Sequence, residues 1–219
     1  MKFINQVKYA NTEQINLVNF KSSSMRMCQR RLQILSKSTK RHPNPPLRRD
    51  RYTINEPYYY YNASSKKLDQ IEHILGVTWI VTWMIHKLSG CEKFYSFDRE
   101  VKEYESQVRL RPDGLIGIEN LMERTIDFTF IEFDIEESGN KFLKVPKYCN
   151  LKLSKAYMKS WWVSKTKSFP RILIVTTGNP RKIRDAIERD NSEGLDFTVV
   201  TLDQLKEECG YGRSSLRHL

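Results

Sequence analysis

The apolar pattern near the start of the chain is that of two short helices. The polar run at residues 11–14 is typical of a helix start, with a capping side chain followed by an acid and an amide. A second helix is expected from Met25 to about Ser36, after the serine run 22–24. Its apolar face has helical spacing and consists of Met25, Cys28, Leu32 and Leu35. Two helices with a tight joint predict a helix-turn-helix.

The next pattern is that of a short β-ribbon. A Pro-rich segment, 42–46, leads into the basic run 48–54, which predicts a β-wing. The tyrosine run 58–61 is expected to pack a final wing strand or the domain junction, with stacking on bases as the alternative. We therefore predict a winged helix-turn-helix domain over residues 1–62.

From residue 63 onward the pattern alternates between helices and strands. Helices are expected at 66–89, 143–162 and 181–189, and strands at 94–101, 109–118, 128–135, 171–177 and 197–202. The order is α-β-β-β-α-β-α-β, which predicts a mixed-sheet α/β domain over residues 63–219.

Charge is distributed unevenly between these two parts. Residues 1–67 hold fourteen Lys or Arg and three acids, which accounts for the whole formal charge of +11, and the remaining 152 residues hold 23 of each. Such a basic segment releases counterions when it neutralises phosphates, so double-stranded DNA is the expected partner. The expected DNA contacts are Arg26, Gln29, Arg30, Arg31, Arg48, Arg49 and Arg51.

The cysteines and the apolar runs exclude other classes of protein. Four widely spaced cysteines with no Cys-x-x-Cys pair argue against a zinc ribbon and against a disulfide framework. The longest apolar stretch, 77–85, is too short to span a bilayer. We expect a reduced, cytoplasmic protein without a membrane partner.

Three acids predict a metal site in the second domain. Asp113 lies on the second predicted strand, and Glu132 and Asp134 lie two apart on the third, so they share a face. Three such carboxylates repel one another unless a cation lies among them, and Mg²⁺ or Mn²⁺ is the expected ion. The alternative is an exposed strand face on which these acids are solvated or paired to Arg109 or Arg111.

The motifs of this second part resemble those of a known superfamily. Pro112-Asp113 on one strand and Glu132-x-Asp134 on the next are similar to the PD-(D/E)xK nuclease pattern. The whole chain resembles the replication-relaxation family of plasmids and phages. The motifs that carry this resemblance are Arg111-Pro112-Asp113-Gly114, Glu132-Phe133-Asp134, Lys144 with Tyr148, and Phe169-Pro170.

The resemblance implies a restriction-endonuclease-like fold and a role in plasmid or phage DNA replication or relaxation. Asp134 occupies the position of the superfamily's lysine, so the family pattern assigns that role to Lys144, with Lys141 or Lys147 as substitutes. The implied catalytic set is Asp113, Glu132, Asp134 and Lys144.

Three functions are compatible with these residues. The first is a DNA-binding protein of the replication-relaxation type. The second is a Mg²⁺-dependent deoxyribonuclease that nicks DNA at a site chosen by the winged helix. The third is a non-catalytic transcriptional regulator. A homodimer is compatible with each, because winged helices often bind two half-sites.

Overall fold

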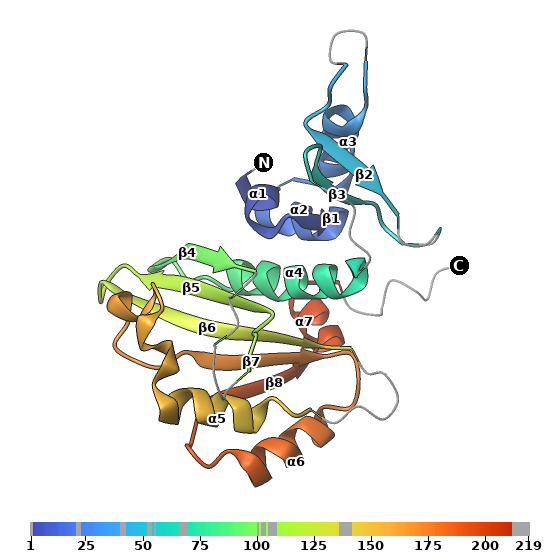
Figure 1. The fold of residues 1–219 in the computed structure, drawn as a ribbon. Coiled ribbons are helices and arrows are strands. Elements are labelled where there is room, and N and C mark those ends of the chain that lie inside the picture. The colour runs from blue at the N-terminus through green and yellow to red at the C-terminus, as the bar shows by residue number, and fades with distance from the viewer. Residues whose placement is uncertain are drawn as a thin grey trace. The chain divides into compact units, whose positions relative to one another are not determined.

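The chain divides into two compact units, Met1–His86 and Lys87–Leu219, in the computed structural model (Figure 1). The structure describes residues 2–20, 23–39, 43–51, 54, 56–65, 70–99, 101, 104, 109–135 and 142–211. The predicted boundary after residue 62 lies too early, because helix α4 (Ile71–His86) packs on elements of the first unit. Lys141 and the start of the helix expected from residue 66 lie outside the described residues.

The first unit contains four helices and three strands in its described part. They are α1 (Lys2–Val7), β1 (Tyr9–Asn11), α2 (Thr12–Asn19), α3 (Met25–Ser36), β2 (Leu47–Asp50), β3 (Tyr59–Asn62) and α4. The two predicted helices are confirmed as α2 and α3. Neither α1 nor β1 was predicted, because each is too short to show a periodic pattern.

The predicted start of α2 is confirmed in detail. The Asn11 side chain accepts a hydrogen bond from the Gln14 N–H at 2.9 Å, and the Gln14 side chain accepts one from the Asn11 N–H at 2.8 Å. This reciprocal pair satisfies two N–H groups that a helix start leaves without partners. Gln14 Nε2 also donates to the Leu75 carbonyl at 2.8 Å, which ties α2 to α4.

The tyrosine run forms the central strand of the first sheet. The strand order is β1-β3-β2 and both pairings are antiparallel. Tyr59 and Tyr61 on β3 are buried with Tyr9, Ile71 and Ile74. The rings of Tyr9 and Tyr61 stack with their centroids 5.4 Å apart. The prediction that these tyrosines pack a strand is confirmed.

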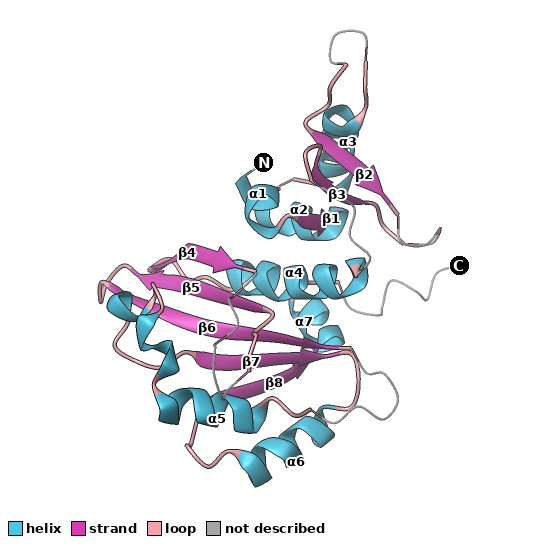
Figure 2. Ribbon diagram, viewed as in Figure 1, coloured by secondary structure: helices cyan, strands magenta, loops and turns pink. Residues whose placement is uncertain are grey.

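The second unit is a mixed α/β structure, as predicted (Figure 2). Its strands and α-helices are β4 (Glu92–Asp98), β5 (Gly114–Asn120), β6 (Thr125–Asp134), α5 (Val145–Ser154), β7 (Arg171–Thr176), α6 (Pro180–Asp190), β8 (Phe197–Thr201) and α7 (Leu202–Glu208). Helix α7, only seven residues long, was not predicted.

The strand order in the second sheet is β4-β5-β6-β7-β8. The first three strands are antiparallel, and β6, β7 and β8 are parallel. Helices α5 and α6 cross between the parallel strands and lie together against one face of the sheet (Figure 1). The core beneath them includes Phe130, Tyr148, Leu151, Ile174 and Ile183.

Two predicted boundaries differ from the structure around the candidate site. Strand β5 begins at Gly114 and not at residue 109, because Pro112 has no N–H for a ladder hydrogen bond. Asp113 therefore lies immediately before the strand. The helix expected to run to residue 162 ends at Ser154, and Lys155 adopts a left-handed φ of 53°. A short 3₁₀ turn, Ala156–Lys159, lies in the second half of the expected helix, and another, Val163–Lys165, follows its expected end.

Candidate functional site

The structure brings one acid–base cluster together in the second unit, where the interior strand β6 ends and its neighbour β5 begins. Asp113 comes from the start of β5 and Glu132 from near the end of β6. Lys144 is the N-cap residue of α5, and Tyr148 lies one turn further along that helix. Residues four apart on a helix share a face, so both α5 side chains reach the same carboxylate.

Glu132 is the centre of this acid–base cluster. It is 1% exposed, and its two carboxylate oxygens have different partners. Lys144 Nζ forms a charged hydrogen bond to Oε2. The Tyr148 hydroxyl donates to Oε1 at 2.5 Å. The alternative of an exposed or Arg-paired Glu132 is therefore wrong, because its partners come from α5.

Asp113 forms the accessible side of the cluster. Its side chain is 18% exposed, and Oδ1 lies 3.7 Å from Lys144 Nζ. Oδ2 accepts a hydrogen bond from the Phe133 N–H at 2.8 Å, while the Asp113 N–H donates to the Ile131 carbonyl at 3.0 Å. These backbone contacts with β6 hold the Asp113 carboxylate beside Glu132, with Lys144 in contact with both.

The electrostatics of the cluster follow from this burial. Burial, together with the negative charge of Asp113, raises the pKa of Glu132 to about 8, although Lys144 and Tyr148 act in the opposite direction. Burial lowers the pKa of Lys144, but the two carboxylates outweigh it and raise that pKa overall. Burial raises the pKa of Tyr148 well above its usual value. The cluster therefore holds a charged lysine beside a carboxyl group that titrates near neutrality.

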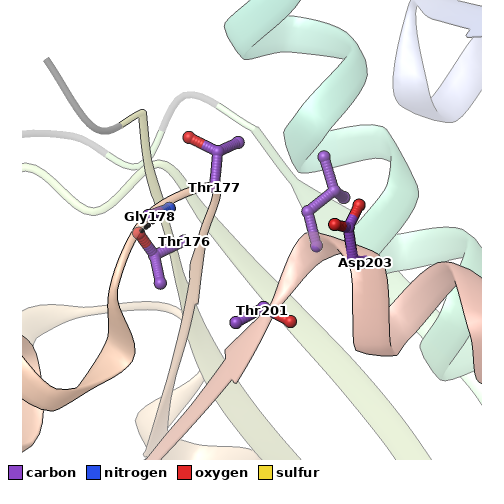
Figure 3. A pocket seen from close by; sticks show the side chains of 6 residues that line it. Thr176, Thr177, Gly178, Thr201 and Asp203 are labelled. Atoms are coloured by element: carbon purple, nitrogen blue, oxygen red, sulfur yellow. Dashed lines mark hydrogen bonds between the residues drawn. The ribbon is translucent and has the colours of Figure 1, made fainter.

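Asp134 does not take part in the Lys144 contacts. Its Oδ2 accepts a hydrogen bond from the Thr176 hydroxyl on β7 at 2.9 Å, and Thr176 Oγ1 accepts one from the Gly178 N–H at 3.0 Å. Thr176 also borders a cleft of about 350 Å³ at the carboxyl ends of β7 and β8 (Figure 3). The cleft is lined by Thr176, Thr177, Gly178, Thr201, Leu202 and Asp203. Asp134 therefore contacts a threonine that lines this cleft, and it is not a member of the acid–base cluster.

The three predicted metal ligands have different contacts: Lys144 contacts Asp113 and Glu132, and Thr176 contacts Asp134. Within the described residues, no three His, Cys, Asp or Glu side chains lie close enough together to hold a metal ion. Two carboxylates with waters and substrate phosphate are nevertheless a donor set that Mg²⁺ uses. Asp113 and Glu132 fit this set by donor type, with Asp113 as the more accessible ligand.

Of the two lysines proposed as substitutes, Lys141 lies outside the described residues, and no contact joins Lys147 to Glu132 in the described part of the chain. Lys147 Nζ donates to the Arg109 carbonyl at 3.2 Å. Lys144 alone among the described candidate lysines contacts both Asp113 and Glu132. Tyr148 was not among the predicted site residues, although it belongs to one of the motifs that carry the family resemblance. Its spacing of four from Lys144 was the signal that places both side chains on one helix face.

The seven predicted DNA contacts all lie in the first unit. On α3, Cys28 and Leu32 are buried, whereas all four predicted contacts on this helix are exposed. These four are Arg26, Gln29, Arg30 and Arg31. The predicted contacts Arg48 and Arg49 on β2, and Arg51 just after it, are also exposed. Helix α3 packs against β2, so the two groups of residues are neighbours within one unit.

Two further observations come from the described residues. In the described part, no helix is long and apolar enough to cross a membrane. All four cysteines are free, as expected from their spacing. Comparison with protein-family models, with curated proteins and with solved structures finds no match for this chain.

Proposed function

We propose that this chain is a double-stranded DNA-binding protein whose first unit is a winged helix. The described elements of this unit follow the order helix, strand, helix, helix, strand, strand, helix, and the first six of them with the sheet order β1-β3-β2 suit a winged helix. Helix α3 is then the recognition helix, and the ribbon of β2 and β3 is the base of the wing.

The observation that carries this proposal is the division of α3 into two faces. Cys28 and Leu32 face the core, while Arg26, Gln29 and Arg30 lie on the opposite, exposed face. Arginine binds guanine edges and phosphates with paired N–H groups, and glutamine binds adenine by donating one hydrogen bond to N7 and accepting one from the N6 amino group. Helix α3 therefore presents base-reading and phosphate-binding groups on one surface.

The biological role follows from the sequence motifs. We propose a protein of the replication-relaxation type, acting in plasmid or phage DNA replication or relaxation in the cytoplasm. The support is the order of the motifs around Asp113, Glu132 and Lys144, three residues that also lie together in space. A homodimer on two half-sites is part of this proposal.

A salt titration of duplex binding tests the proposal. Replacing Arg26 and Arg30 together by alanine should weaken binding at least about tenfold and lower the log–log salt slope, because about one slope unit is lost with each phosphate contact. The matched control replaces Lys159 and Lys167, two exposed lysines of the second unit, by alanine. Equal binding by both double variants would overturn the assignment of α3.

The acid–base cluster favours a second function, a metal-dependent deoxyribonuclease. Asp113 and Glu132 would hold Mg²⁺ or Mn²⁺, and such an ion polarises a phosphate and lowers the pKa of a bound water. Lys144 holds the buried Glu132 carboxylate in place and supplies a positive charge beside Asp113. Tyr148 fixes the other oxygen of Glu132.

Incubation of supercoiled plasmid with Mg²⁺ or Mn²⁺ tests this second function. Asp113→Asn keeps an acceptor for the Phe133 N–H but removes the charge, so it should abolish nicking and leave DNA binding intact. Asp127→Ala changes an exposed acid on β6 and is the control. Mg²⁺ should also raise the unfolding midpoint of the wild type and of the control, but not of Asp113→Asn.

Plasmid nicking and the effect of Mg²⁺ on the unfolding midpoint together distinguish the nuclease from a non-catalytic DNA-binding protein. Cutting that survives Asp113→Asn would place the activity elsewhere. Retardation of the plasmid without cutting and without stabilisation by Mg²⁺ would leave a non-catalytic DNA-binding protein, which includes the transcriptional regulator.

A further inference from the structure

Two arginine side chains lie over a single tyrosine ring at the base of the proposed wing. The guanidinium carbon of Arg51 is 3.9 Å from the centroid of the Tyr58 ring, and that of Arg49 is 4.7 Å from it. Both distances are within the range of cation–π attraction. Arg49 and Arg51 are exposed, and the Tyr58 side chain is half-buried.

The strand register explains why these three side chains meet. Arg49 is paired with Tyr60 across β2 and β3, so Arg49 and Arg51 share the face of the ribbon on which Tyr58 also lies. Arg48 is paired with Tyr61 and points to the opposite face. The cluster of Arg49, Arg51 and Tyr58 therefore excludes the third arginine of the strand.

Local contacts hold the members of the cluster in position. The Tyr58 carbonyl accepts hydrogen bonds from the Thr12 N–H at 3.1 Å and the Thr12 hydroxyl at 3.2 Å. Arg51 Nη1 donates to the Ile54 carbonyl at 3.1 Å, and the Arg51 N–H donates to Asp50 Oδ1 at 2.9 Å. These contacts fix the backbone at Tyr58 and Arg51 and the side chain of Arg51 before any ligand arrives, so less conformational entropy is lost on binding.

Two guanidinium groups over one ring repel each other unless an anion lies between them. A guanidinium group that stacks on a ring by its flat face can still donate from the N–H groups at its edge, and on Arg51 one of these groups already donates to the Ile54 carbonyl. Such N–H edges match the paired oxygens of a phosphate. The arrangement is therefore suited to an anion with several oxygens.

We propose that Arg49, Arg51 and Tyr58 form a binding site for one backbone phosphate of duplex DNA, with Tyr58 as the residue that positions both arginines. This inference rests on the proposed DNA-binding function and assigns a ligand to one part of its surface. A phosphate carries no base identity, so the site contributes to affinity equally on all duplex sequences.

The test is duplex binding by fluorescence anisotropy over a range of salt concentrations. Arg49→Ala/Arg51→Ala should lower the log–log salt slope by about 0.9, the value for one phosphate, although two charges are removed. Tyr58→Leu should weaken binding about three- to tenfold, and Tyr58→Phe, which keeps the ring, should bind like the wild type. The same changes are expected on two duplexes of unrelated sequence.

Lys159→Ala/Lys167→Ala is the matched control, because it removes two exposed charges from the second unit, outside the proposed DNA-binding surface, and should leave binding and the salt slope unchanged. The double arginine variant leaves the ring untouched, so it tests the site even where Tyr58→Leu does not fold. A wild type that binds no duplex would overturn the proposed function and this site with it.

A wild type that binds duplex can overturn the phosphate site alone. The site would be wrong if Arg49→Ala/Arg51→Ala left the log–log salt slope unchanged. It would also be wrong if the slope fell by about 1.8, the value for two separate phosphates. Tyr58→Leu that folds and binds like the wild type would overturn the positioning role of the ring.

Discussion

The hydroxyl of Tyr148 donates a hydrogen bond of 2.5 Å to Oε1 of Glu132, and both side chains are buried. The tyrosine lies on α5 and the glutamate on β6, so this bond joins the helix layer to the sheet. A buried carboxyl group is costly unless its oxygens have partners. Tyr148 therefore helps to keep Glu132 inside the second unit, where it can contact Lys144.

Tyr148→Phe should destabilise the second unit by about 1–3 kcal/mol, because it leaves one oxygen of the buried Glu132 without its donor. The same change should raise the pKa of Glu132 further, since the hydrogen bond from Tyr148 lowers it. Urea unfolding followed by tryptophan fluorescence measures the effect. Tyr157→Phe, at a ring that stacks on Trp162, is the control. Equal unfolding midpoints for the two variants would contradict this role.

Glu132→Gln should change how stability depends on pH. Glu132 has a pKa of about 8 in the folded chain, against an ordinary value of 4.5, so the folded state binds its proton more tightly. The wild type should then lose stability as pH rises from about 4.5 to about 8. The upper limit of this loss is about 5 kcal/mol, because one pKa unit corresponds to about 1.4 kcal/mol.

The neutral amide that replaces the carboxyl group in this variant cannot lose a proton, so the variant should lack that part of the pH dependence. Urea unfolding of both proteins between pH 4.5 and pH 8.5 measures the difference. If the free energy of unfolding of the wild type and of Glu132→Gln changed with pH in parallel, Glu132 would have the same pKa in the folded and unfolded chain.

Sequence patterns predicted the long elements of this fold and missed the short ones. The apolar periods of α3 and the β-branched run of β7 extend over enough residues to be distinctive. Helices α1 and α7 have six and seven residues, too few for such a period. The domain boundary was misplaced because α4 is apolar on most of its surface, and such a helix does not show which unit it joins.

The candidate site was predictable where residues are close in the sequence or belong to a known motif. The Pro-Asp-Gly and Glu-x-Asp motifs predicted Asp113 and Glu132, and the family pattern predicted Lys144. The partner of Asp134 was not predictable, because Thr176 is 42 residues away and becomes a neighbour only through the pairing of β6 with β7. A shared strand face was thus insufficient to place Asp134 with Glu132.

Gly117→Ala should destabilise the second unit by about 1–3 kcal/mol through overpacking. A Cβ at this position would lie 2.9 Å from Phe128 Cε1, 3.1 Å from Ser96 Oγ and 3.2 Å from Tyr95 Cδ1. Phe128 is buried in the core, so it cannot easily move away. Gly90→Ala is the control, because a Cβ there meets nothing within 4 Å. Thermal unfolding of both variants measures the difference, and equal melting temperatures would contradict the close packing between β5 and β6.

Lys144→Met should reveal the charge coupling within the cluster. At pH 9 the wild type pairs an ionised Glu132 with Lys144, whereas the variant must either leave this buried charge unpaired beside Asp113 or protonate it, so we expect a loss of about 2–4 kcal/mol, less than for a fully buried pair because Lys144 is partly exposed. At pH 5 Glu132 is protonated in both proteins, and the loss should be smaller. Lys159→Met, at an exposed lysine, is the control at both pH values.

The double variant Glu132→Gln/Lys144→Met completes a double-mutant cycle, which measures the coupling energy between Glu132 and Lys144. With the buried charge removed, losing the lysine should cost less than it does in the wild type, by a coupling energy of about 1–3 kcal/mol at pH 9. Urea unfolding of the wild type, both single variants and the double variant gives this coupling energy directly. Additive losses at pH 9 would mean that Lys144 stabilises the second unit through Asp113 or through packing, and not through Glu132. The short contact with Glu132 would then have no energetic role.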